Sequence, residues 1–221
     1  MTDILPILAI ETSDALCGAC VYFDNKKFFS SKILLKHSHS EKLFELINAA
    51  LENAEIKINE IKSIAVSAGP GSFTGLRIGM SAAKGIAQPL NIPIIPVQTF
   101  KALALQISCY LKVGSAFIIA NKVGKDELYF GKFQIKANND IFQEELKIIQ
   151  NSELKYLCEG VAVFGNISSE IFNIDVKNIS APDPDYIAKW ASEYGDKNLV
   201  YDFDFLEPNY LKEFIVKEKK L

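Results

Sequence analysis

The sequence has few histidines, the side chain that general acid–base catalysis uses most often. It has only 2 histidines and 1 tryptophan among 221 residues. No stretch approaches the ~20 apolar residues of a membrane span. The apolar start of the chain, residues 4–10, ends at Glu11 and has no basic segment before it, which is unlike a signal peptide. We therefore expect a cytoplasmic protein without a membrane segment.

Excess charge of one sign is also missing. Lys and Arg number 24 against 27 Asp and Glu, which gives a net charge of −3 and a pI of about 5.5. A protein that grips an RNA backbone unaided is usually basic, so strong RNA binding by this chain alone is not expected. The hydrophobic share of 49% and the length instead indicate a folded globular protein with one large domain or two small lobes.

The four cysteines do not form a convincing metal or disulfide pattern. Cys17 and Cys20 stand three apart in a segment that reads as a strand, and positions three apart on a strand point to opposite faces. Cys109 and Cys158 are isolated. We therefore expect inert thiols and no metal site, with zinc or redox use as the alternative.

The first hundred residues alternate in a clear order of strands and helices. A helix is expected from Ser40, which can cap it, another after the glycine-rich segment 67–85, and a third over 98–111. Strands are predicted over 4–11, 17–24, 27–35, 61–67 and 92–97. Three strands followed by alternating helix and strand is the ribonuclease-H-like order that actin-like proteins duplicate.

The second half repeats this order more weakly. Segment 142–149 has a mixed period, and a helix over 183–194 has Asp183 or Asp185 at its start. Strands are predicted over 115–120, 127–135 and 161–165. The second half could therefore be an eroded copy of the first unit, on element order alone. The N-terminal part would span residues 1–105, and the smaller C-terminal part would span 106–221 and end in a basic tail.

The glycine-rich segment does not match a known phosphate loop. No G-x-x-x-x-G-K-[ST] string occurs, and the spacing of Gly69, Gly71 and Gly75 is one residue too wide for a dinucleotide fingerprint. An actin-like site would need an Asp-x-Gly turn in the first hairpin, where this chain has Glu11-Thr12-Ser13. The metal chemistry of such a site is therefore missing, and a phosphate contact is not required. Glu11 and Asp14 are interpreted as turn chemistry.

Gly75, Gly79 and Ala83 form a ladder of small residues on one side of the predicted helix. Each glycine costs ~1 kcal/mol against alanine within a helix, so close packing must offset the loss. The packing element could be the chain's own sheet, the helix from Ser40, or another chain.

The helix from Ser40 supports the last of these readings. Leu43 and Ile47 lie on its core stripe, and Phe44 and Leu51 extend the apolar arc beyond the ~100° that one sheet requires. The predicted partner interface comprises Leu46, Ala49, Phe73, Gly75, Leu76, Gly79, Met80 and Ala83.

Several segments of residues 4–104 resemble the bacterial TsaB (YeaZ) family. The most specific is "GPGSFTGLRIG", residues 69–79, and "EPNYLKE", residues 207–213, resembles the family's C-terminal element. The motif-loop residues are Gly69, Pro70, Gly71, Ser72, Thr74 and Arg77. Glu127 and Tyr129 match a Glu-x-Tyr of the family. Lys122, Val123 and Gly124 replace its Asp-Ala-Arg, so contacts made there are in doubt.

The resemblance implies an α/β fold of the actin-like (ASKHA), ribonuclease-H-like class in two lobes, the second reduced, with the partner-binding helices in the N-terminal lobe. It also implies a role. It implies a non-catalytic subunit that binds and activates TsaD, which transfers a threonylcarbamoyl group to the adenosine beside the tRNA anticodon. TsaD would be bound through the first-lobe helices, TsaE would join the complex, and a homodimer would form in isolation. Contact with tRNA would come only through the complex. No cofactor is implied, although a nucleotide at the junction with TsaD stays open.

Two other functions stay open on the sequence. One is an independent actin-like ATPase or a glycoprotease-like hydrolase, although no nucleophile–base pair is visible. The other is a self-associating scaffold. The enzyme relative holds its metal with a H-x-x-x-H pair, whereas His37 and His39 are two apart. They are interpreted as exposed polar groups before a helix, with a lone metal site as the alternative.

Overall fold

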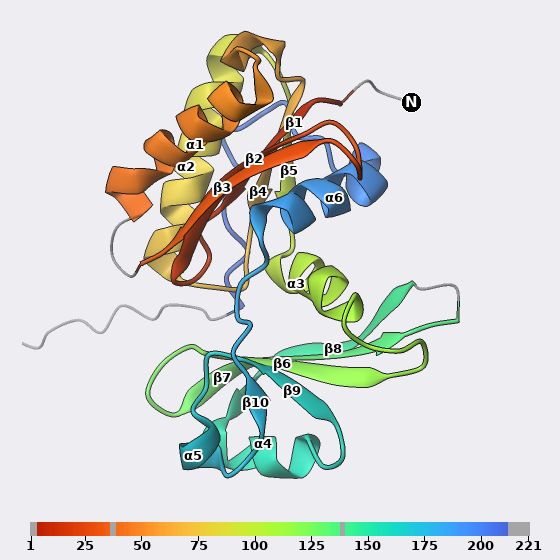
Figure 1. Cartoon of the computed structure of the whole chain (residues 1–221). Coiled ribbons are helices and arrows are strands. Elements are labelled where there is room, and N and C mark those ends of the chain that lie inside the picture. The colour runs from red at the N-terminus through yellow and green to blue at the C-terminus, as the bar shows by residue number, and fades with distance from the viewer. Residues whose placement is uncertain (1–3, 36–38, 138–139, 212–221) are drawn as a thin grey trace, which may run out of the picture.

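A computed structural model describes residues 4–35, 39–137 and 140–211 and folds them into two lobes, each built on a five-stranded sheet (Figure 1). In the first sheet the strand order is β3-β2-β1-β4-β5. The antiparallel strands are β1 (Ile7–Glu11), β2 (Leu16–Tyr22) and β3 (Phe28–Leu34). The strands parallel to β1 are β4 (Ser63–Ser67) and β5 (Ile94–Val97).

The second sheet has the same topology. Its order is β8-β7-β6-β9-β10, with the first three strands antiparallel and the last two parallel to β6. The strands are β6 (Ala116–Lys122), β7 (Glu127–Ile135), β8 (Ile141–Gln150), β9 (Ala162–Gly165) and β10 (Val176–Lys177). This repeat confirms the predicted fold class.

The helical layer distinguishes the lobes. In the first lobe, α1 (His39–Ala54) and α2 (Phe73–Leu90) have 16 and 18 residues and cover one face of the sheet (Figure 1). Their counterparts in the second lobe, α4 (Asn151–Leu157) and α5 (Ser169–Phe172), have 7 and 4 residues. The second lobe is therefore reduced, as predicted. None of the described helices is long and apolar enough to span a membrane.

The lobes exchange their last helices. The first-lobe helix α3 (Thr99–Ser108) packs Phe100 and Leu103 into the core of the second sheet. The second-lobe helix α6 (Pro184–Tyr194) packs Ile187 and Ala191 against the face of the first sheet opposite α1 and α2. Short 3-10 helices, η1 (Ile58–Glu60) and η2 (Gly195–Lys197), are the remaining helical elements of the residues that the structure describes. The boundary after residue 105 stays a prediction.

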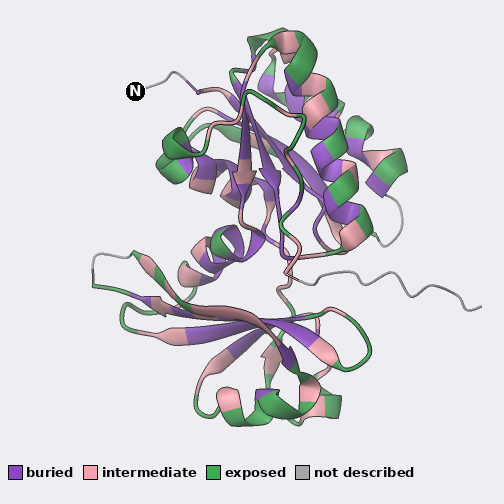
Figure 2. Ribbon diagram, turned by 180° about the vertical axis from the view of Figure 1, so that it is seen from behind, coloured by how far each residue is buried: buried purple, intermediate pink, exposed green. Residues whose placement is uncertain are grey.

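The two cores of the first lobe settle the geometry of the cysteine pair. The purple strands of Figure 2 are buried on both faces. Cys17 belongs to the core under α1 and α2, and Cys20 belongs to the core under α6, so their predicted opposite orientation is confirmed. Burial raises the pKa of Cys17 to about 11 and that of Cys20 to about 12, which favours the protonated form of both thiols at neutral pH.

Two elements differ from the sequence prediction. Helix α1 begins at His39, so Ser40 lies inside it and does not cap it. The segment of mixed period is strand β8, which pairs with β7 along its length. A shift in register between Lys132 and Phe133 places an extra residue in β8. Such a bulge reverses the alternation of side chains, which explains the mixed period.

Candidate functional site

The glycines of the 69–79 segment pack directly on the turn that follows β1. A Cβ on Gly75 would lie 2.0 Å from the carbonyl oxygen of Thr12, and one on Gly79 would lie 2.3 Å from Thr12 Oγ1. Thr12 Oγ1 donates a hydrogen bond to the Gly75 carbonyl at 2.8 Å, and Ser72 N donates to the Ser13 carbonyl at 2.6 Å. The glycines therefore let the helix approach the chain's own backbone.

The C-terminal segment lies on the other side of this loop. Gly69 has φ +107°, and a Cβ there would lie 2.5 Å from the carbonyl oxygen of Asn209. Asn209 N donates to the Ala68 carbonyl at 2.7 Å. Two of the segments that resemble the family, the glycine-rich one and the C-terminal one, are thus in direct contact.

Arg77 extends this contact to the surface of α2. Its Nε donates to the hydroxyl of Tyr210 at 3.0 Å, and its guanidinium lies 3.8 Å from the centre of the Phe73 ring. The Phe73 and Tyr210 rings are 5.0 Å apart. Arg77 therefore fixes the C-terminal segment beside the first turn of α2, a role that sequence reasoning did not identify.

Glu11 is completely buried at the end of β1. Its carboxylate accepts hydrogen bonds from Ser13 N at 2.5 Å and from the hydroxyl of Ser67. Burial raises the pKa of Glu11 to about 7, and the charge of Asp14 adds a small further rise. Hydrogen bonds from Ser13 and Ser67 lower the pKa and offset part of this rise. The carboxyl links β1 to β4 and is not presented to a ligand.

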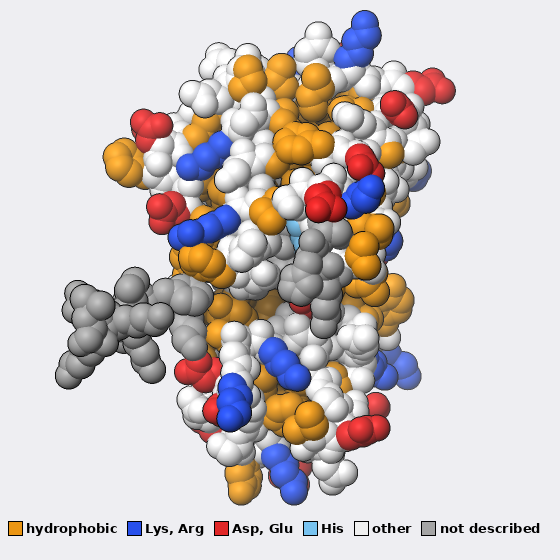
Figure 3. Space-filling model, turned by 90° about the vertical axis from the view of Figure 1, so that its left-hand side faces the viewer, with side chains coloured by type: hydrophobic (Ala, Val, Ile, Leu, Met, Phe, Trp, Pro, Cys, Tyr) orange, Lys and Arg blue, Asp and Glu red, His pale blue; other side chains and the backbone are white. Residues whose placement is uncertain are grey.

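An open groove of about 570 Å³ runs between α1 and α2. Its floor and walls are largely apolar, and the Phe44 side chain is 54% exposed at its edge. The lining residues are Ser40, Leu43, Phe44, Phe73, Thr74, Arg77, Ile78, Ser81 and Ala82. Figure 3 shows hydrophobic side chains gathered over the upper lobe on this side of the molecule.

The predicted interface is only partly exposed. Leu46, Ala49 and Phe73 are half-buried at the surface. Gly75, Leu76, Gly79, Met80 and Ala83 are buried inside the chain. The proposal that a partner helix lies on the glycine ladder is therefore corrected, because Thr12 already occupies that strip. Phe44 and Ile78 were left out of the predicted interface, although the wide apolar arc around Phe44 pointed to this face.

A second cavity of about 790 Å³ lies between the lobes at the carboxyl ends of the central strands. Asn166 Nδ2 in the second lobe donates to Asp14 Oδ2 in the first at 3.0 Å, and Lys122 N donates to Asn166 Oδ1 at 2.8 Å. His39 is buried, and its Nε2 lies 2.7 Å from the Asp14 carbonyl. The prediction that His39 is an exposed polar group is therefore wrong, and His37 lies outside the described residues.

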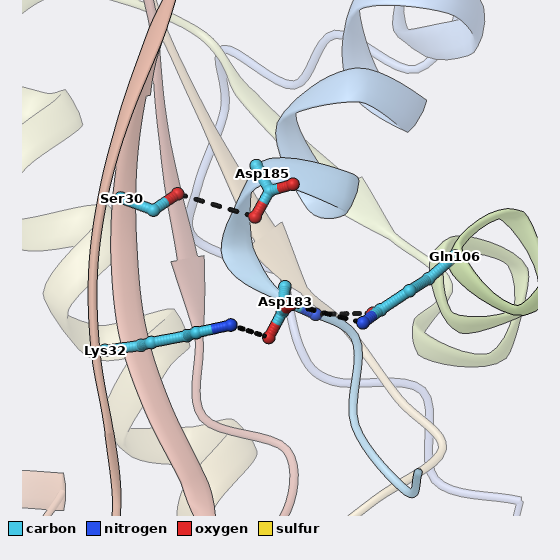
Figure 4. A network of polar contacts seen from close by, with 5 residues as sticks. All are labelled: Ser30, Lys32, Gln106, Asp183 and Asp185. Carbon is cyan, nitrogen blue, oxygen red and sulfur yellow. Dashed lines mark hydrogen bonds and ion pairs between the residues drawn. The ribbon is translucent and has the colours of Figure 1, made fainter. Parts of the chain in front are cut away.

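Asp183 joins three elements at the rim of this cavity (Figure 4). It forms an ion pair with Lys32 of β3 at 2.5 Å, and its Oδ2 accepts from Gln106 Nε2 of α3 at 3.2 Å. Asp183 N donates to Gln106 Oε1 at 2.8 Å, and Ser30 Oγ contacts Asp185 at 3.5 Å. Asp183 precedes α6 as predicted, but its side chain binds these neighbours and makes no capping bond.

The segment that departs from the family pattern also borders the cavity. Lys122 is exposed and lines it, Val123 packs on the second-lobe core, and Gly124 is exposed. Glu127 and Tyr129 stand in β7, where burial raises the pKa of Tyr129. Within the described residues, no group of three or more His, Cys, Asp or Glu side chains is placed to hold a metal ion.

Comparison with known proteins connects this geometry to a family. Residues 33–188 match the family model described as TsaD: tRNA N6-adenosine threonylcarbamoyltransferase. The tRNA threonylcarbamoyladenosine biosynthesis protein TsaB of Haemophilus influenzae is 25% identical over 97% of both chains. The protein of the same name from Buchnera aphidicola subsp. Baizongia pistaciae is 29% identical over 94% of this chain and 98% of its own. In fold, the structure matches YeaZ from Pseudomonas aeruginosa with a TM-score of 0.77 and 20% identity, over 92% of this chain and 98% of that one.

Proposed function

Because the chain belongs to the TsaD family, and within it to the TsaB (YeaZ) proteins, we propose that it is a non-catalytic subunit that binds and activates TsaD. It would act in the synthesis of threonylcarbamoyladenosine in tRNA, the pathway named for its relatives. TsaE would join the complex, tRNA would be reached only through it, and the site of action would be the cytoplasm.

The groove between α1 and α2 is the observation that carries this proposal. An apolar groove between two helices can receive the apolar face of a helix from another chain. Phe44 and Ile78 offer apolar contacts, and Ser40, Thr74 and Ser81 supply a polar rim. A rimmed apolar patch of this kind is typical of a protein-binding surface. We assign its occupant as a helix of TsaD.

The interlobe cavity supports the non-catalytic part of the proposal. Glu11 is buried, Asp14 is bound by Asn166, and Asp183 is paired with Lys32, so these carboxylates are committed to contacts within the chain. Lys122 is the cation among the lining residues, beside Asp14 and Asp183. This donor set does not fit the phosphates and metal ion of a nucleotide, which need several cations or free backbone N–H groups. We derive no catalytic step through the cavity.

The proposal is tested by mixing the chain with TsaD and measuring complex mass and affinity. Phe44→Asp places a charge in the groove and should weaken binding at least tenfold, or about 1.4 kcal/mol. The matched control is Phe142→Asp on β8, where the side chain is 52% exposed in the other lobe. It should bind TsaD as the parent does.

The same experiment distinguishes the other functions. A homodimer that persists at excess TsaD would favour the self-associating scaffold and contradict the proposal. ATP or peptide hydrolysis by the purified chain alone would favour an independent enzyme. Stimulation of tRNA modification by the parent chain, and its loss with Phe44→Asp alone, is the expected result.

A further inference from the structure

A third cavity, of about 660 Å³, lies at the junction of the lobes on the side formed by α3, α6 and β8. One wall comes from β5, α3 and α6, and the opposite wall comes from β7 and β8 of the second sheet. The residues that the argument uses are Gln98, Lys101, Phe133, Gln143, Trp190 and Tyr194. The volume is within the range of small-molecule sites, roughly 300–1,000 Å³.

Aromatic side chains provide one part of this site. Trp190 and Tyr194 lie one turn apart on α6, with ring centres 5.5 Å apart and planes tilted by 42°. Phe133 of β7 lies behind the lining, completely buried and stacked on Phe117, so Trp190 and Tyr194 are the rings that can meet a ligand. Trp190 is the only tryptophan of the chain, and it is only half-buried beside the cavity. Rings arranged in this way can stack on a planar ligand.

Two carboxamides provide the other part. Gln98 Oε1 and Gln143 Oε1 are buried and have no hydrogen-bond partner among the residues that the structure describes. A buried acceptor without a donor destabilises the protein, so a ligand that supplies the donor is favoured there. The last torsion of glutamine is broad, so either carboxamide can rotate to present its oxygen or its amide to the cavity. The pair comes from opposite walls, Gln98 at the start of α3 and Gln143 on β8.

We propose that this cavity binds a purine base with an exocyclic amino group, of which adenine is the best match. A glutamine carboxamide pairs with adenine when its oxygen accepts from the exocyclic amino group and its amide donates to a ring nitrogen. The amino group supplies the donor that Oε1 of Gln98 and Oε1 of Gln143 lack. The base stacks on Trp190, as unpaired bases do on aromatic side chains. The charged residues at the lining are Lys101 and Asp140, and Lys101 is the one that can meet a ribose or phosphate oxygen.

The base can come from a free nucleotide or from an unpaired position of an RNA strand. Both sources present the same ring and edge to the cavity, and they differ in the phosphates beyond it. The site does not include the groove between α1 and α2, so it stands independently of the proposed partnership with TsaD. Its test needs only the purified chain.

The fluorescence of Trp190 reports binding directly, because no other tryptophan contributes. AMP should quench it in a saturable titration, and UMP, which lacks an exocyclic amino group, should bind at least tenfold more weakly. A short single-stranded oligoadenylate forms the second arm. Quenching by AMP identifies a free nucleotide as a sufficient ligand, and quenching by the oligonucleotide alone assigns the site to RNA.

Substitution separates base recognition from nonspecific contact. Gln143→Met keeps the length of the side chain, removes the carboxamide, and should weaken AMP or oligoadenylate binding about tenfold. The matched control is Gln88→Met, an exposed glutamine on α2, which should leave binding unchanged. The proposal is overturned if neither ligand quenches Trp190, if UMP binds as well as AMP, or if folded Gln143→Met binds like the parent.

Discussion

The two lobes have sheets of the same topology, but they differ in the pair of residues that joins the central parallel strands at their carboxyl ends. The central parallel strands end their pairing at Ile10 and Val66 in the first lobe and at Ala120 and Gly165 in the second. One position further on, Ser67 donates to Glu11 in the first lobe, and Asn166 N donates to Asn121 Oδ1 in the second at 3.2 Å. The same place in the fold thus holds a titratable carboxyl in one lobe and a neutral carboxamide in the other.

The two lobes also differ in the length of the helices that cover their sheets. Helices α1 and α2 are long enough to leave a groove between them, whereas α4 and α5 are one or two turns long. Both sheets bury their central strands, so the sheet is what the two halves have in common. The candidate partner surface belongs to the layer in which they differ. Each comparison can be tested by substitution, beginning with the contact between α2 and the β1–β2 turn of the first lobe.

The largest effect is expected from Gly75→Ala. Its Cβ would lie 2.0 Å from a backbone oxygen of Thr12, which no side-chain rotation can relieve. We expect a loss of about 3 kcal/mol or more in the free energy of unfolding, measured by urea denaturation. Gly85→Ala in the same helix is the control, because nothing lies within 4 Å of its Cβ.

The control should gain up to about 1 kcal/mol from helix propensity. Gly165→Ala tests the second lobe in the same way, since its Cβ would lie 1.9 Å from the Ala120 carbonyl at a φ of +149°. If Gly75→Ala keeps the parental stability, the close contact between α2 and the β1–β2 turn is misplaced.

The buried Glu11 carboxyl of the first lobe should make the free energy of unfolding depend on pH. The pKa of Glu11 is raised from 4.5 to about 7, so the folded state binds more protons than the unfolded state between those values. The free energy of unfolding therefore falls as the pH rises through this window and stays lower above it. We expect Glu11→Gln to remove this fall, which amounts to about 3 kcal/mol.

The measurement is urea denaturation of parent and variant at pH 5 and pH 8. The groups that face Glu11 are Ser13, Ser67 and Asp14, and the nearby Cys17 thiol has a pKa of about 11. A parent that gains stability relative to Glu11→Gln on going from pH 5 to pH 8 would show that the ionised carboxyl is favoured in this lobe.

Local pattern predicted the strands well because most of them are short apolar runs bounded by polar or turn residues, and β1 and β4 are buried at every position. Strand β7 was predicted over 127–135, the range in which it lies. The bulge concealed β8, and α4 and α5 are too short for a clear helical period. The C-terminal strand β10 has two residues, which is too few for any period.

The site was predictable only in part, because its contacts join distant segments. The small residues Gly75 and Gly79 predicted close packing on one side of the helix. The residue that packs there, Thr12, is 63 positions away from Gly75 in the sequence. The bond between Arg77 and Tyr210 spans 133 positions. Helical periodicity shows which face is buried and cannot say what covers it, so the ladder was assigned to another chain.

The smallest effect is expected where the C-terminal segment returns to the first lobe. Tyr210→Phe removes the hydroxyl that accepts from Arg77 Nε and keeps the ring beside Phe73, 5.0 Å away. The bond is exposed, so its loss should cost about 0.5–1 kcal/mol in the free energy of unfolding. Tyr201→Phe, at an exposed position of the same segment, is the control and should be neutral. The Arg77–Tyr210 bond joins the segment to α2, while Leu211 packs on the second-lobe core. Limited proteolysis should therefore cut the Tyr210→Phe chain faster near residues 203–210 while β6–β9 stay protected. Equal cutting of both variants would mean that the Phe73 ring and the Asn209–Ala68 bond hold the segment without the hydroxyl.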